Sequence, residues 1–180
     1  MRPFDRPELL SADHDVAAFD CGSEAQTTWL RRYALQAQQS DAARVYVACA
    51  AGTRRVTGYY ALAAGSVEHD SAAPRVTQGL GRYPVPVVVL ARLGVDVAAQ
   101  GLGLGFSLVQ DALLQTASVA DRIGVRALLI HAETVEAAEF YRHFSPAFIE
   151  SPTDPLDLIL LLKDLRSALR DAANQPISDG

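Results

Sequence analysis

The segment 85–105 joins a long apolar run to a turn with three alternating glycines, and it constrains the fold more than any other part of the chain. Residues 85–95 are almost entirely apolar, which predicts a strand in the middle of a sheet. The turn, residues 100–105, follows and leads into a helix predicted over about 102–119, with apolar positions at helical spacing. This order predicts an anion site, because successive glycines let backbone amides converge where a helix begins.

Three nucleotide-binding schemes use such a turn, and the residues separate them. The Walker type requires Gly-Lys-Ser/Thr, whereas Gly105 is followed by Phe106. The dinucleotide type requires Gly-x-Gly-x-x-Gly, which the spacing of Gly101, Gly103 and Gly105 does not match. The acetyl-CoA scheme, Gln/Arg-x-x-Gly-x-Gly/Ala, is matched from Gln100 onward. A pattern this short is also compatible with a flexible turn.

The rest of the chain alternates strand and helix patterns. Ser23 is placed to cap a helix from about residue 24, and we expect Trp29, Leu30, Tyr33 and Ala37 to share one face of it. The other expected elements are a hairpin of 45–50 and 56–67, a loop over 68–84, a strand over 125–132, a helix over 134–144 and a strand over 156–162. These predict an α+β fold in a mixed three-layer α/β/α plan, with a single domain over 1–169 and a polar, disordered tail over 170–180.

Charge is unevenly distributed along this acidic chain, whose net charge is −5. Residues 25–110 hold eight arginines against four acids, which predicts a basic face suited to a polyanion. A genome that encodes arginine throughout explains the same pattern equally well. The histidines and the two cysteines show no ligand spacing, so we expect no metal. The absence of a long apolar run or a leader predicts a cytoplasmic protein without a membrane span.

The segment 90–96 before the turn and Phe140-Tyr141 about 35 residues after it resemble the GNAT acetyltransferase superfamily. The resemblance implies a central mixed, mostly antiparallel sheet that is splayed at the acetyl-CoA site. It also implies acetyl-CoA as cosubstrate, with backbone amides of the strand holding the pantetheine arm and the turn holding the pyrophosphate. The implied cofactor-binding residues are Leu93, Gly94, Val95, Gln100, Gly101, Leu102, Gly103, Leu104, Gly105 and Phe140.

By the same resemblance, Tyr141 is the general acid that protonates the departing thiolate. By composition alone, an aromatic residue packed in a helix is the favoured explanation, and the match of Tyr141 together with the glycine turn reverses that preference. The family continues Phe-Gly-Phe after this helix, whereas this chain is one residue longer and has a proline within 144–148. No base is evident: Asp96 and Glu133 suit capping or surface roles, and His131, which ends a buried strand, suits a structural role.

Further motifs extend the resemblance over nearly the whole chain. They include segments 19–22, 29–30, 46–48, 58–63, 65–67, 84–86, 154–155 and 160–165. Together these are similar to the GNAT toxins of bacterial toxin–antitoxin pairs. The resemblance implies acetylation of the α-amine of aminoacyl-tRNA, an inhibitory ribbon-helix-helix antitoxin and a homodimer. The candidate substrate-binding residues are Arg31, Arg32, Tyr60, Arg75, Arg82 and Arg92.

Two other functions remain compatible with the sequence. One is a GNAT enzyme that acetylates a small amine or a protein N-terminus, which the acidic balance of the chain suits. The other is a CoA-binding interaction protein without turnover, for which the altered 145–148 turn is the one indication.

Overall fold

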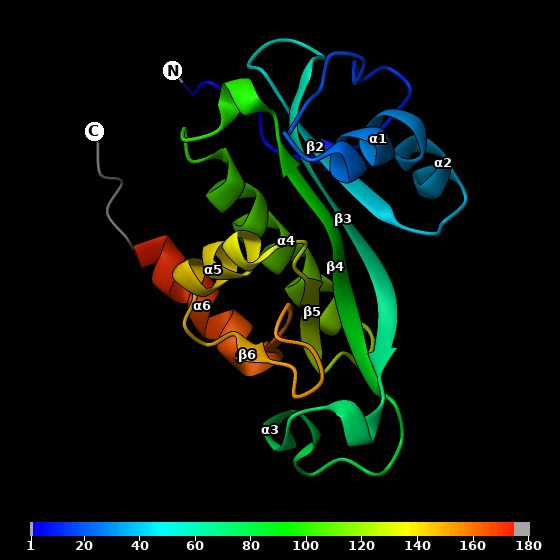
Figure 1. The fold of residues 1–180 in the computed structure, drawn as a ribbon, viewed down its shortest axis with the longest axis vertical. Helices are drawn as coiled ribbons and strands as arrows, with labels where there is room; N and C mark the ends of the chain where they lie inside the picture. The colour runs from blue at the N-terminus through cyan, green and yellow to red at the C-terminus, as the bar shows by residue number, and fades with distance from the viewer. Residues whose placement is uncertain (1, 175–180) are drawn as a thin grey trace. The chain divides into compact units, whose positions relative to one another are not determined.

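The computed structural model describes residues 2–174. Within these residues, seven strands form a mixed, mostly antiparallel sheet in the order β1-β2-β3-β4-β5-β7-β6, accompanied by six α-helices (Figure 1). The predicted α+β fold class is confirmed. The strands are β1 (Glu8–Leu9), β2 (Arg44–Cys49), β3 (Val56–Val67), β4 (Val85–Val95), β5 (Ala127–His131), β6 (Ile149–Glu150) and β7 (Asp157–Leu161). The helices are α1 (Glu24–Arg32), α2 (Ala34–Gln39), α3 (Pro74–Thr77), α4 (Leu104–Ala120), α5 (Val135–Phe144) and α6 (Leu162–Asn174), with 3-10 turns η1 (His69–Ser71) and η2 (Val97–Ala99).

The chain divides into two compact units, which are described separately. The first unit contains Met1–Ala63 and Leu90–Ala112, and the second contains Ala64–Val89 and Leu113–Gly180. β3, β4 and α4 each contribute residues to both units.

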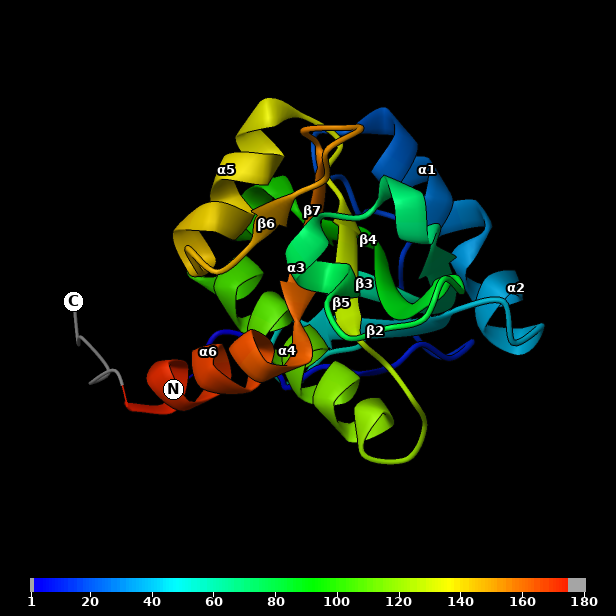
Figure 2. The ribbon, with the colours of Figure 1, turned by 90° about the horizontal axis from the view of Figure 1, so that it is seen from below.

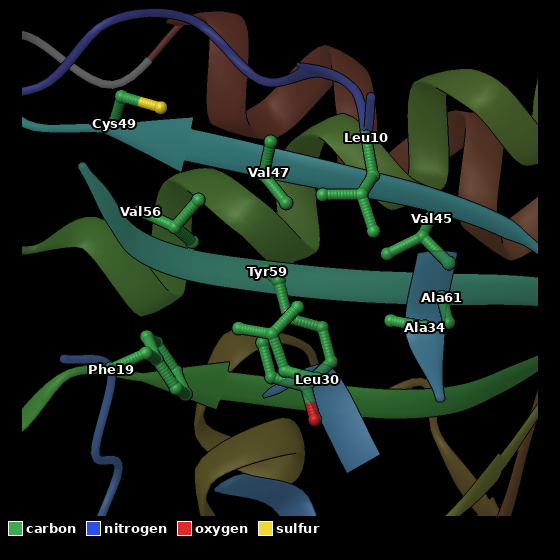
Figure 3. Close-up of a cluster of buried hydrophobic side chains, with 10 residues drawn as sticks. All are labelled: Leu10, Phe19, Leu30, Ala34, Val45, Val47, Cys49, Val56, Tyr59 and Ala61. Carbon is green, nitrogen blue, oxygen red and sulfur yellow. The ribbon is translucent and has the colours of Figure 1, made fainter. Parts of the chain in front are cut away.

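In the first unit, β1, β2 and β3 pair antiparallel, and α1 and α2 pack together beside them (Figure 1). Their shared core gathers side chains from β2, β3, α1 and the N-terminal segment, including Phe19, Leu30, Val47 and Tyr59 (Figure 3). Because side chains alternate along a strand, Tyr59 and Tyr60 leave β3 on opposite faces. Tyr59 contacts Phe19 and Trp29, whereas Tyr60 reaches α4.

In the second unit, β7 pairs antiparallel with both β5 and β6. One face of β5 and β7 packs against Val76 of α3, which follows β3 along the chain. α5 lies beside β6 (Figure 2), where Arg142 of α5 forms an ion pair with Glu150 of β6. α6 contacts β5 and β7.

Most of the predicted elements are confirmed within a few residues, and α4 buries the expected stripe of Val109, Ala112, Leu113 and Thr116. The face predicted for the first helix is wrong at Tyr33, which is 53% exposed. Its backbone, at φ −120° and ψ −23°, interrupts the helix, so α1 ends at Arg32 and α2 begins at Ala34.

Two other segments are more ordered than the sequence predicted. The loop expected over 68–84 contains η1 and α3. Of the tail expected over 170–180, residues 170–174 form the end of α6, and 175–180 lie outside the described residues. In the described part of the chain, no helix is long and apolar enough to cross a membrane.

Candidate functional site

The end of β4 forms the first part of the candidate cofactor site, in the first unit. Leu93 and Val95 are half-buried and Gly94 is buried. A Cβ at Gly94 would lie 2.9 Å from the ring of Tyr59 and 3.3 Å from the Cys21 sulfur, so only glycine fits at this position without displacing its neighbours. The backbone of β4 at Gly94 therefore packs closely against Tyr59.

The turn after β4 is held by side-chain hydrogen bonds. Asp96 caps η2 by accepting from the Ala98 amide at 2.9 Å, and it also accepts from Asp20. The amide group of Gln100 donates to the carbonyls of Cys21, at 3.1 Å, and Val95, at 3.0 Å. The predicted capping role of Asp96 is confirmed. The side chain of Gln100 therefore holds the turn against β4 and the segment at Cys21. Because this side chain is engaged in those two bonds, any ligand contact of Gln100 would come from its backbone.

The glycines of the turn leave its outer side open. Gly101 and Gly103 have φ of 77° and 81°, the left-handed region that favours glycine. A Cβ at either position would meet no atom within 4 Å. α4 begins at Leu104, and the first amides of a helix have no partner within the helix. An exposed turn that leads into the positive end of a helix dipole fits a pyrophosphate group, such as that of acetyl-CoA.

Tyr141 lies in the second unit on α5, which is capped by the Thr134 hydroxyl. Tyr141 is only 6% exposed and packs against the rings of Phe140 and Phe148. Burial raises the pKa of its hydroxyl above the ordinary value, so the group is protonated at neutral pH, as a general acid must be. α5 ends at Phe144, so the altered turn over 145–148 begins after Tyr141.

The predicted substrate-binding arginines are distributed over both units. Arg31 and Arg32, exposed on α1, line a hollow of about 490 Å³ in the first unit, together with His14 and Thr28. In the same unit the guanidinium of Arg92 lies 5.4 Å from the centre of the Trp29 ring, a cation–π contact.

In the second unit, Arg75 pairs with Asp164 at 2.8 Å, and Arg82 is exposed. A basic face shared by all five arginines stays a prediction.

Tyr60 is fully buried, and its hydroxyl donates to the Asp111 carboxylate of α4. Its ring stacks on Tyr46, with 4.9 Å between the ring centres. Burial and the bond to Asp111 raise the pKa of the Tyr60 hydroxyl, and burial raises the pKa of the Asp111 carboxyl. A substrate-binding role for Tyr60 stays a prediction.

A second hollow, which the sequence did not indicate, lies in the second unit and is named here the His131 pocket. It has a volume of about 250 Å³ and is lined by Ser66, Val67, Glu68, Ser71, Leu129, His131, Ser151, Thr153, Asp157 and Ile159. His131 Nδ1 and the Asp157 carboxylate are hydrogen-bonded there. The sequence placed His131 at the end of a buried strand, but it gave no indication that Asp157, 26 residues away, lies beside it.

No cluster of three or more metal-ligating side chains occurs in the described part of the chain. Cys21 and Cys49 are free thiols, half-buried and buried respectively.

Solved structures with the same fold identify the class of protein. The structure of AtaT complexed with acetyl-methionyl-tRNAfMet matches with a TM-score of 0.82 and 27% identity, covering 91% of this chain and 98% of that one. The structure of AtaTR bound with acetyl-CoA matches with a TM-score of 0.78 and 27% identity, covering 93% and 98%. The fold, the glycine-rich turn and the tyrosine helix define a GNAT-type acetyltransferase.

Sequence comparison narrows the class. The chain is 44% identical over 171 residues to the tRNA-acetylating toxin of Mycobacterium tuberculosis, covering 95% of this chain and all of the relative. It is 27% identical over 164 residues to the probable toxin TacT of Sinorhizobium fredii, covering 87% and 90%. No protein-family model matches the sequence. The chain therefore belongs to the family of GNAT-type tRNA-acetylating toxins.

Proposed function

We propose that this protein transfers the acetyl group of acetyl-CoA to the α-amine of the amino acid carried on charged tRNA, and so blocks translation. The observation that carries the proposal is the 44% identity to the Mycobacterium tuberculosis toxin along nearly the whole chain. The open glycine turn before α4 and the buried, protonated Tyr141 supply the two features that this chemistry needs.

In this proposal, Leu93, Gly94 and Val95 hold the pantetheine arm through their backbone, and the turn from Gln100 to Gly105 holds the pyrophosphate. Tyr141 donates its hydroxyl proton to the thiolate that leaves as the amide forms. A hydroxyl with a raised pKa keeps that proton until a strong base, such as a developing thiolate, appears beside it.

The lower pKa of an α-amine, compared with that of a lysine side chain, favours it as the acceptor. An α-amine has an ordinary pKa of about 7.7–8.0, so part of it is neutral near pH 7, whereas a lysine side chain at about 10.4 is almost fully charged. The arginines that line the hollow at α1 supply phosphate contacts for the tRNA.

The partners follow from the same family. Structures of the AtaT–AtaR complex bound to DNA and of an AtaT mutant bound to the C-terminus of AtaR show a toxin held by its antitoxin. We propose an antitoxin of ribbon-helix-helix type for this protein, and a homodimer in the cytoplasm, where charged tRNA is found. Size-exclusion chromatography with light scattering tests the dimer.

The direct test is incubation of the purified protein with radiolabelled acetyl-CoA and total bacterial charged tRNA. The expected result is label on the tRNA that alkaline deacylation releases as an acetylated amino acid. Chromatography of the released product identifies that amino acid.

Label absent from tRNA, with acetyl-CoA still bound, would overturn the proposed acceptor. Transfer to a small amine or a protein N-terminus would then identify the alternative GNAT activity. Bound CoA without transfer to any of these acceptors would indicate a CoA-binding protein without turnover.

A further inference from the structure

The turn after β4 rests on a segment that lies far upstream in the chain, residues 20–22, which is named here the backing segment. The Asp20 carbonyl accepts a hydrogen bond from the Val97 amide at 2.8 Å, and the Asp20 amide donates to the Asp96 carboxylate at 3.1 Å. All of these residues belong to the first unit. The backing segment is therefore bonded directly to the chain that leads from β4 into the glycine turn.

The backing segment is itself held by α1. The Cys21 amide donates to the Thr27 hydroxyl at 3.1 Å, and the Cys21 sulfur lies 3.4 Å from the same hydroxyl oxygen. Thr27 and Leu30 are buried on α1, so the helix that holds the segment is packed into the core of the first unit. The Gly22 amide also donates to the Asp20 carboxylate at 2.8 Å. The backing segment is thus a fixed support for the turn.

Asp96 ties the backing segment to the end of β4 through both oxygens of its carboxylate. Oδ1 accepts from the Ala98 amide at 2.9 Å, and Oδ2 accepts from the Asp20 amide at 3.1 Å. The backbone amide of Asp96 donates to the Thr57 carbonyl of β3 at 2.8 Å. Asp96 is only 5% exposed, so its carboxylate is used inside the protein.

Gln100 makes a second tie at the other end of the same stretch. Its side-chain amide donates to the Cys21 carbonyl at 3.1 Å and to the Val95 carbonyl at 3.0 Å. Gly101, the first glycine of the turn, follows directly. The two side chains therefore hold residues 96–100 at both ends.

The glycine turn needs such support because its own backbone is unusually free. Gly101 and Gly103 have φ of 77° and 81°, and glycine loses more conformational freedom on ordering than any other residue. A ligand that binds one conformation of a turn has its affinity reduced in proportion to the fraction of molecules in that conformation. Contacts that fix the turn in advance therefore raise the affinity for the ligand.

We propose that Asp96 and Gln100 are positioning residues that set the affinity for acetyl-CoA by fixing the glycine turn to the backing segment. This inference rests on the assignment of the turn to the pyrophosphate in the proposed function. Neither side chain needs to touch the cofactor, because both act through the backbone of the turn. Their loss weakens cofactor binding and leaves the chemical step intact.

The first test is calorimetry with CoA on Gln100→Met, which keeps the length of the side chain and removes both donors. Loss of these hydrogen bonds predicts about tenfold weaker binding. The matched control is Gln38→Met in the same unit, because the Gln38 side chain also holds backbone, accepting from the Val45 amide at 2.8 Å. The control should keep the affinity of the wild type.

The second test is Asp96→Asn, measured in the same way. Asparagine has one oxygen and one NH₂ group, so it accepts from one of the two amides and turns a donor toward the other. We expect a loss of CoA affinity of about tenfold. Asp154→Asn is its control, since Asp154 holds the Leu156 amide at 2.9 Å in the second unit. Gln100 is exposed, so Gln100→Met decides the question if Asp96→Asn does not fold.

The third test separates binding from chemistry in the acetylation of charged tRNA. Gln100→Met should raise the KM for acetyl-CoA by about tenfold, as its CoA affinity falls, and leave kcat at saturating acetyl-CoA unchanged. A residue that acts in the chemical step would lower kcat instead.

The outcomes distinguish this inference from the proposed function. Wild-type protein that binds CoA and does not acetylate tRNA contradicts the proposed function, and the calorimetry still decides the inference. Unchanged CoA affinity in Gln100→Met overturns the positioning role. An equal loss in Gln38→Met overturns it as well, because it shows general destabilisation. A fall in kcat with KM unchanged is the third result that contradicts it.

Discussion

The hydroxyl of Tyr60 on β3 donates a hydrogen bond to the Asp111 carboxylate on α4, 51 residues away in the first unit. Tyr60 is fully buried and Asp111 is half-buried, and burial raises the pKa of each group. This hydrogen bond holds α4, the helix that begins at the glycine turn, against β3.

Tyr60→Phe should destabilise the protein, because it leaves the half-buried Asp111 carboxylate without its donor. We expect a loss of about 1–3 kcal/mol in the free energy of unfolding. Urea denaturation at pH 7 measures it. Tyr83→Phe, at a tyrosine 78% exposed, is the matched control and should leave the denaturation midpoint unchanged.

Asp111→Asn should raise the free energy of unfolding at neutral pH, whereas Tyr60→Phe should lower it. A carboxyl whose pKa is raised on folding contributes stability that is fully present in acid and is lost as pH rises through the folded-state pKa. Asparagine carries no charge to shield and can still accept from Tyr60. The variant should therefore be more stable than the wild type at pH 7. The difference should vanish below about pH 3.8, the ordinary pKa of aspartate, and a difference independent of pH would contradict this account.

Gly94→Ala should strain the first unit. The new Cβ would meet the Tyr59 ring at 2.9 Å, and that ring is held by a 2.8 Å bond from its hydroxyl to the Gln26 carbonyl and by stacking on Trp29. Overpacking of this kind costs about 1–3 kcal/mol of unfolding free energy. Gly124→Ala, which adds its Cβ in open space, should stay within about 0.5 kcal/mol of the wild type by the same urea measurement.

Gly103→Ala should weaken CoA binding. The residue has φ of 81°, a conformation that costs a residue with a Cβ about 1–2 kcal/mol, so the turn would relax away from its binding form. That cost predicts a loss of affinity of about five- to thirtyfold by calorimetry with CoA. Gly79→Ala, at φ 79° and likewise in open space, imposes the same strain and should leave CoA affinity unchanged. Equal losses in both variants would show that general destabilisation is the cause.

Tyr141→Phe should separate binding from turnover. Loss of a general acid lowers kcat by about 10²–10⁴, whereas the buried ring and its contacts with Phe148 are retained. CoA affinity and the thermal midpoint should therefore change little. The wild-type profile should also show no decline from Tyr141 ionisation up to pH 9, because burial raises its pKa. Undiminished turnover in the variant would remove Tyr141 from the mechanism.

Replacement of Arg31 and Arg32 together by Gln should lower the salt dependence of tRNA binding. Each lost phosphate contact should reduce the slope of log K against log salt by about 1. Filter binding between 50 and 200 mM salt measures the slope. Arg166→Gln is the matched control, because Arg166 is not among the candidate substrate-binding residues and its guanidinium is paired with Asp121 at 3.1 Å. A slope unchanged in the double variant would place the tRNA contacts elsewhere.

The sequence predicted the parts of the fold that depend on local patterns. Apolar periodicity predicted the buried face of α4, and the glycines predicted the turn before it, because both are set by dihedral preference and side-chain spacing within a few residues. The interruption at Tyr33 was not predicted, since no glycine or proline marks it. In the structure, α1 and α2 contact one another across this break.

From the sequence alone, the order of strand, glycine turn and helix was predicted, as were the position of Tyr141 on a helix after a buried strand and the family of the protein. Two contacts between distant residues, Asp111 with Tyr60 and Asp157 with His131, became apparent only in the folded chain. The physical reason is strand register. A shift of one residue between β5 and β7 would turn Asp157 to the other face of the sheet, and the register is set by burial of the whole strand rather than by either residue.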